Sequence, residues 1–200
     1  MPRLDQPPRD RAADHPGAAR DDHAQRPPRR YGLVARALGS GALASLASTV
    51  VASAWSRHVA GSVPAATNAT SQWAWDRPAR HVDGWSWRHT ALGYLIHHAS
   101  SVFWASGYEA WCARSPGRPL AKAGAVAALA YVVDYHVVPR RLSPGFERRV
   151  SPPGLACVYA SFALGLALAH AVGHRSGTPR PPRRPVLGQP RQRAQRQRRQ

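Results

Sequence analysis

Residues 37–56 read ALGSGALASLASTVVASAWS, a run of 20 residues without Asp, Glu, Lys or Arg. A helix needs about 20 apolar residues to cross the hydrocarbon core of a bilayer. Three further stretches, 90–108, 123–138 and 150–174, contain a single residue of those four types, Asp134. The sequence therefore predicts an all-α fold, a four-helix transmembrane bundle. The expected helices cover about residues 33–56, 89–111, 120–138 and 153–172.

Both ends of the chain differ sharply from its middle. Residues 1–31 and 175–200 hold 16 of the 28 Lys and Arg residues and most of the prolines. They lack the apolar content that would offset the entropy of ordering a chain. We expect two disordered basic tails around one membrane domain, residues 32–174. A net charge of +18 would indicate nucleic acid in a soluble protein, but beside apolar helices it favours anionic lipid headgroups as the partner.

The first apolar stretch carries small residues at every fourth position, from Ala37 through Gly41 and Ser45 to Thr49 and Ser53. In lipid such a stripe lets helix backbones approach closely. The partner helix could belong to the same chain, to a second copy in a homo-oligomer, or to a larger membrane complex. The arginine pair before this stretch partly resembles a twin-arginine export signal, but the apolar run is long for one, so we expect an uncleaved first helix.

The long connection at residues 57–89 carries Trp73, Trp75, Trp85 and Trp87. Tryptophan favours the boundary between membrane and water, so this connection is expected to lie along the interface, with a short helix near residues 70–75. With four crossings, the tails and the second loop share one side with 19 Lys and Arg residues, against 8 on the other. Because cytoplasmic segments carry the excess of basic residues, both tails are expected in the cytoplasm of a bacterium, beneath its inner membrane.

Five polar residues are expected at similar depth in the outer half of the bundle: His97, His98, Asp134, His136 and Tyr159. Ionisable groups at membrane depth are costly and usually face the bundle interior. With a helical rise of 1.5 Å per residue, these residues lie at similar depths if neighbouring helices are antiparallel. Adjacent histidines diverge by about 100° around a helix, so His97 and His98 are not expected to bind one metal together.

A second polar group is expected near the other membrane surface, formed by Arg36, Glu109, Lys122 and His170. Glu109 is expected to pair with Arg36 or Lys122, because an unpaired carboxylate at this depth tends to take up a proton. His98 and Glu109 are eleven residues apart and therefore share a helix face, the expected interior face of the second helix.

Three functions are compatible with these groups. In the first, the protein is structural or accessory and its buried polar residues fix helix packing. In the second, His97, His98, Asp134 and His136 handle protons, metal ions or a transported substrate. In the third, imidazoles hold a metal or haem in a redox protein, although no cofactor is expected from any motif. The signatures of soluble enzymes are absent from the sequence, and catalysis is not the favoured interpretation.

Three segments carry a resemblance: WRHT at 87–90, GYLIHHASSVFW at 93–104 and VDYHVVPRRL at 133–142. They resemble a group of small inner-membrane proteins from high-GC proteobacteria. The likeness covers roughly residues 32–172 and excludes both tails. It implies a four-pass membrane fold, and it implies nothing about chemistry or functional residues.

Overall fold

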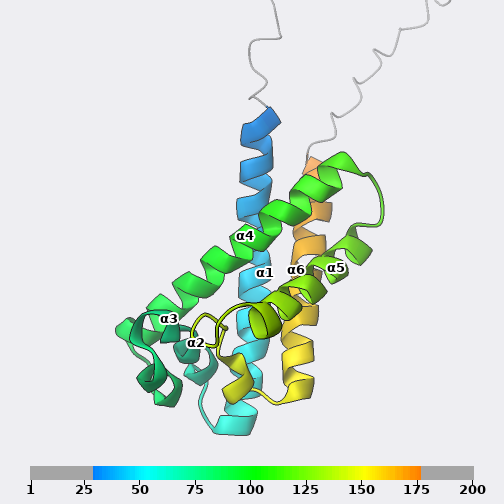
Figure 1. Ribbon diagram of the computed structural model, residues 1–200. Coiled ribbons are helices and arrows are strands. Elements are labelled where there is room, and N and C mark those ends of the chain that lie inside the picture. Colours follow the sequence, from blue (N-terminus) through cyan, green and yellow to red (C-terminus); the bar gives the residue numbers. More distant parts are fainter. Residues whose placement is uncertain (1–28, 177–200) are drawn as a thin grey trace, which may run out of the picture.

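The computed structural model describes residues 29–176, and every regular element in that range is a helix. Four helices are long: α1 (Arg29–Ala60), α4 (Leu92–Arg114), α5 (Pro119–Val132) and α6 (Pro152–Ser176). Figure 1 shows α1 and α6 side by side, with α4 and α5 crossing them obliquely. The short elements are α2 (Ala65–Thr70), α3 (Gln72–Trp75), the 3-10 helices η2 (Arg77–His81) and η5 (Phe146–Arg148), and the π-helical turns η3 (Trp87–Ala91) and η4 (Val133–Val137).

The four long helices alternate in direction. The start of α1 and the end of α6 lie at the same end of the molecule, as the two ends of the described chain in Figure 1 show. Between them α4 runs back toward that end and α5 runs away from it again. The most extensive packing joins α1 to α6 and to α4, so α1 is the central helix.

Small residues bring these backbones close together. A Cβ atom added to Gly165 of α6 would lie 2.6 Å from the Cα atom of Ala44 in α1, and one added to Gly41 would lie 2.6 Å from the Cα atom of Val102 in α4. Ala37, Gly41 and Ser45 of the expected stripe are buried. This part of the stripe is therefore used for packing inside one chain and offers no free surface to a second copy.

Three helices are long and apolar enough to cross a membrane: Gly32–Ala60, Pro119–Val137 and Pro152–Gly173. Their length and composition indicate a membrane protein. The expected four spans include α4, whose 23 residues extend about 34 Å. However, α4 also contains His97, His98 and Glu109, and it is not among the three helices with a sufficiently apolar window.

The short elements other than η4 form a cap at the end of the bundle opposite the described termini, built from residues 61–91 and 138–151. All six residues of α2 are buried at its centre. Asn68 holds the cap together: its side-chain nitrogen donates to the carbonyls of Val82 and Gly84, both at 2.9 Å, and its oxygen accepts from Thr90 at 2.6 Å. The long connection expected to lie along the membrane interface is thus part of a folded unit, because its polar side chains bond to its own backbone.

Element bounds differ from those expected mainly at helix ends. Helix α1 extends from residue 29 to residue 60, several residues beyond each expected end. The third expected helix is α-helical only to Val132 and then makes the π-helical turn η4, which carries Asp134 and ends before Pro139. The expected disordered tails lie outside the described residues, except for residues 29–31 and 175–176, which are helical.

Candidate functional site

Two adjacent histidines of α4 are hydrogen-bonded to serines of α1. Nε2 of His97 lies 2.9 Å from Oγ of Ser48, and Nδ1 of His98 lies 2.8 Å from Oγ of Ser45. Both serines are fully buried. The two imidazoles point in different directions from α4. Each still finds a partner, because the two serines lie nearly one helical turn apart on α1.

A second polar pair joins the end of α5 to α6. The hydroxyl of Tyr159 donates to Oδ2 of Asp134 at 2.7 Å. Asp134 lies in η4, the π-helical turn that follows the end of α5. The rings of Tyr131 and Tyr135 pack against that of Tyr159, with centroids 5.4 and 6.2 Å away, and shield one side of the pair.

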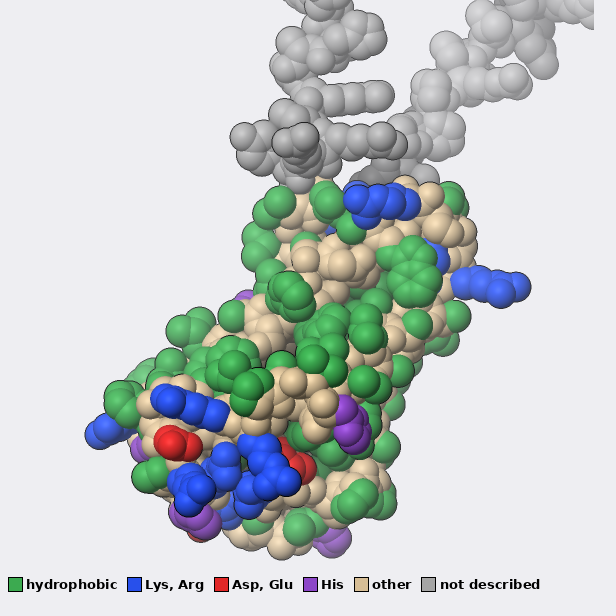
Figure 2. All heavy atoms as spheres, viewed as in Figure 1, with side chains coloured by type: hydrophobic (Ala, Val, Ile, Leu, Met, Phe, Trp, Pro, Cys, Tyr) green, Lys and Arg blue, Asp and Glu red, His purple; other side chains and the backbone are tan. Residues whose placement is uncertain are grey.

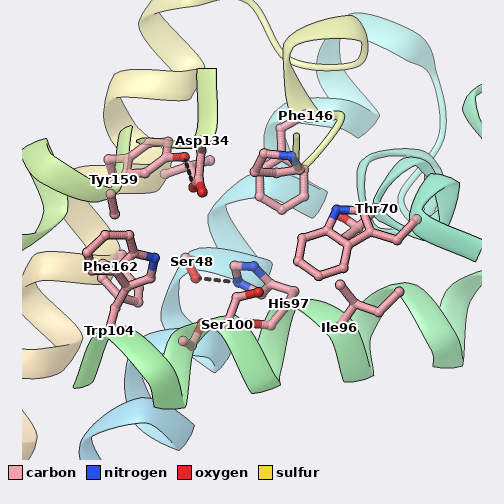
Figure 3. Close-up of a pocket in the computed structure, with 15 residues that line it drawn as sticks. Ser48, Thr70, Ile96, His97, Ser100, Trp104, Asp134, Phe146, Tyr159 and Phe162 are labelled. Carbon is pink, nitrogen blue, oxygen red and sulfur yellow. Dashed lines mark hydrogen bonds between the residues drawn. The ribbon is translucent and has the colours of Figure 1, made fainter. Parts of the chain in front are cut away.

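His97, Asp134 and Tyr159 line one small cavity, together with Ser48 and Thr70. Figure 3 shows His97 reaching up from α4, the Asp134–Tyr159 pair on one side and Phe146 above. The ring of Phe146 meets the His97 imidazole edge to face at 5.4 Å. The remaining walls are mainly apolar and include Trp73, Ile96, Trp104 and Phe162.

The cavity has a volume of about 40 Å³. A water molecule needs roughly 10–15 Å³ of such volume, so two or three waters fit and a drug-sized ligand does not. The hydroxyl of Thr70 is buried and has no hydrogen-bond partner among the described residues, and this residue is 2 % exposed. This unpaired hydroxyl in the cavity wall is suited to hydrogen-bond a water or a small polar ligand, because leaving such a group unpaired is costly.

The expected five-residue cluster is therefore divided. His98 does not line the cavity and bonds instead to Ser45. His136 is exposed and packs its ring against Tyr131 at 5.9 Å. The reason is helical geometry: a residue one or two positions away from an inward-facing one turns to a different side of its helix. Within residues 29–176 no three His, Cys, Asp or Glu side chains come close enough to hold a metal ion.

The expected inner group is also rearranged. Oε1 of Glu109 accepts from Ser40 at 2.5 Å, and Oε2 lies 3.0 Å from Nδ1 of His170. The expected pairing of Glu109 with Arg36 or Lys122 is therefore wrong. The ammonium of Lys122 donates instead to the carbonyl of Ser115 in the loop before its own helix, and Nε of Arg36 is buried without a partner in the described chain.

Comparisons with protein-family models, with curated proteins and with solved structures find no match to this chain. The resemblance to small proteobacterial inner-membrane proteins rests on the three quoted segments alone.

Sequence reasoning missed the partners of the polar groups. Ser40, Ser45 and Ser48 are the α1 side of three interhelical hydrogen bonds. Serine serves equally well as a small packing residue, so composition does not distinguish the two roles. Thr70 and Phe146 come to the cavity from the cap, and nothing in their local sequence indicates this.

Proposed function

We propose that this chain is a four-pass protein of a bacterial cytoplasmic membrane with a structural or accessory role, in which polar side chains hold the helices in register. One observation supports this most: His97, His98 and Glu109 of α4 are each hydrogen-bonded to a serine of α1. Polar groups are costly in hydrocarbon unless they are paired. The long helix that lacks a sufficiently apolar window is thus held in the bundle by its hydrogen bonds to α1.

Helix α4 is the proposed fourth span. It is long enough to cross. Its His97, His98 and Glu109 side chains bond to α1, while Leu95 and Phe103 are 61 % and 67 % exposed, as side chains facing lipid would be. Its direction, opposite to those of α1 and α5, supports an even number of crossings with both tails on one side. The excess of Lys and Arg on that side supports a cytoplasmic location for the tails.

A double-mutant cycle on His98 and Ser45 tests the packing role. Interhelical hydrogen bonds in membrane proteins are worth about 0.6 kcal/mol on average and rarely exceed about 1.7 kcal/mol. We expect His98→Ala and Ser45→Ala each to lower the free energy of unfolding, with a coupling of about 1 kcal/mol when combined. The measurement is denaturant unfolding in mixed micelles.

Ser106→Ala is the matched control, because Ser106 lies on the exposed side of α4 and bonds only to its own helix. It should change the unfolding free energy little. Strictly additive effects of His98→Ala and Ser45→Ala would contradict the proposal.

The cavity favours a second candidate function, proton transfer between His97 and the Asp134–Tyr159 pair. Imidazole and carboxylate side chains are suited to exchanging protons. The two or three waters that fit the cavity would link them by hydrogen bonds, and the Thr70 hydroxyl would hold one of these waters. In this candidate the interhelical bonds remain, but the cavity rather than the packing is the functional element.

Proton flux into proteoliposomes separates the two candidates. If the cavity conducts protons, the full-length protein should collapse an imposed pH gradient faster than empty vesicles do. Asp134→Asn, which keeps an oxygen acceptor for Tyr159 but cannot titrate, should restore the rate of empty vesicles. His136→Ala, outside the cavity, should leave the flux unchanged. Equal rates for wild-type protein and empty vesicles would reject the second candidate and leave the packing role.

A further inference from the structure

The cap carries a hollow of about 500 Å³ whose wall is dominated by arginine. Figure 2 shows Lys and Arg side chains gathered over the lower end of the molecule. The wall is built from two segments that are far apart in sequence, one at η2 and one between η4 and α6. It consists of Arg77, Arg80, Arg140, Arg141 and Arg148, with His81 and Asp76.

A buried glutamine ties the two arginine-bearing segments together. Gln72 is 0 % exposed, and its side-chain oxygen accepts from Nε of Arg80. Its side-chain nitrogen donates to the carbonyl of Ser143 at 2.5 Å and reaches that of Arg140 at 3.5 Å. The chain on both sides of the hollow is thereby fixed in place before any ligand arrives, which reduces the ordering cost of binding.

Other contacts hold the remaining wall. Nη2 of Arg141 reaches the carbonyl of Trp73 at 3.5 Å. Nε of Arg149 donates to the carbonyl of Arg80 at 2.8 Å, while its Nη1 forms an ion pair with Asp83 at 2.7 Å. Arg149 therefore uses its charge within the cap and helps to position Arg80.

Within residues 29–176, the positive charges that line the hollow outnumber the carboxylates beside them. Among the described residues, Arg77, Arg80, Arg140 and Arg141 make no salt bridge, whereas Arg148 has a long contact of 3.9 Å to Glu147. Asp76 is the single carboxylate in a wall with five guanidinium groups. Such a concentration of one sign in a concave surface raises the local concentration of anions.

We infer that this hollow binds a phosphate-bearing anion. Guanidinium groups match the oxygens of phosphate with two parallel hydrogen bonds, and several of them together favour a multiply charged oxyanion. The phosphate belongs either to a lipid headgroup or to a soluble molecule. Exposed tryptophans of the same cap, Trp85 and Trp87 at 74 % and 91 %, are suited to the headgroup layer. Binding of a lipid headgroup rests on the proposed membrane location, whereas binding of a soluble phosphate does not.

Two probes on the full-length protein in a neutral detergent distinguish the sources. Pyrophosphate is titrated by calorimetry, and binding of phosphatidylglycerol is compared with that of phosphatidylcholine by native mass spectrometry. The test variant is Arg77→Gln/Arg140→Gln/Arg141→Gln, all three positions being exposed. The control removes the same charge elsewhere, by Arg57→Gln/Arg114→Gln/Arg118→Gln, and keeps both basic tails.

We expect the test variant to bind the recognised probe roughly 100-fold more weakly, because each basic residue contributes about a factor of five to binding of an anionic headgroup. The control should stay within a factor of about three of wild type. Loss confined to phosphatidylglycerol supports a lipid ligand, and loss confined to pyrophosphate supports a soluble one. If the triple variant does not fold, Arg140→Gln alone should still weaken binding about fivefold.

Equal binding by the test variant and the control, with both probes, would overturn the inference. Failure of the membrane proposal has a separate signature. In that case the protein would remain in the supernatant without detergent while still binding pyrophosphate through these arginines.

Discussion

Replacing Glu109 by alanine is expected to lower the free energy of unfolding by about 3 kcal/mol, because each buried hydrogen-bonding partner that is left unsatisfied costs about 1–3 kcal/mol. Glu109 is 1 % exposed and is the acceptor at the junction of three helices. The substitution removes the acceptor of Ser40 on α1 and the carboxylate beside His170 on α6. Denaturant unfolding in mixed micelles measures the loss.

Two further variants identify the cause. Glu109→Gln keeps an oxygen acceptor for Ser40 and should lose less stability than Glu109→Ala. Glu147→Ala removes a carboxylate from an exposed ion pair with a 3.9 Å contact and should cost well under 1 kcal/mol. A Glu109→Ala protein as stable as the Glu147→Ala protein would show that the junction does not hold the helices.

Replacing Gly165 by alanine is expected to destabilise the protein by about 1–3 kcal/mol, the usual cost of overpacking a close contact. The added Cβ would lie 2.6 Å from Cα of Ala44 and 3.1 Å from the carbonyl oxygen of Leu43. Backbone atoms cannot move aside as a flexible side chain does, so α1 and α6 would have to separate. The same unfolding measurement applies.

Gly173 is the matched control because it lies in the same helix and has nothing within 4 Å of an added Cβ. Gly173→Ala should leave the stability unchanged or raise it by up to about 1 kcal/mol, since alanine is the better helix former. If Gly165→Ala behaved like Gly173→Ala, the close approach of α1 and α6 would be wrong.

Hydrophobic runs and the rise per residue of a helix are local properties, so the positions of the long helices could be predicted from the sequence. The long helices occupy the apolar stretches. Because neighbouring helices are antiparallel, the depths of the two groups of polar residues could be predicted as well. At one level Tyr159 donates to Asp134, and at the other Glu109 lies beside His170. Both contacts join residues that the sequence had placed at the same depth.

The remaining contacts of the candidate site depend on how each helix is rotated about its axis and on how the cap folds. No periodicity in this chain predicts either of these. A rotation of about 100° decides whether His98 or its neighbour faces the cavity. Opposite charge predicts Arg36 or Lys122 as the partner of Glu109, whereas in the structure the hydroxyl of Ser40 on α1 donates to it. The arginine hollow joins η2 to a loop about 60 residues later, and only the fold of the cap brings them together.

Labelling from one side of the membrane tests the four-pass topology directly. In a chain with Cys112→Ser and Cys157→Ser, single cysteines are introduced as Gly84→Cys in the cap and as Ser115→Cys in the loop between α4 and α5, both exposed positions. A membrane-impermeant maleimide is applied to intact spheroplasts. If α4 crosses the bilayer and the tails are cytoplasmic, Gly84→Cys is labelled at once and Ser115→Cys only after permeabilisation. Equal labelling of the two cysteines in intact spheroplasts would contradict a crossing by α4.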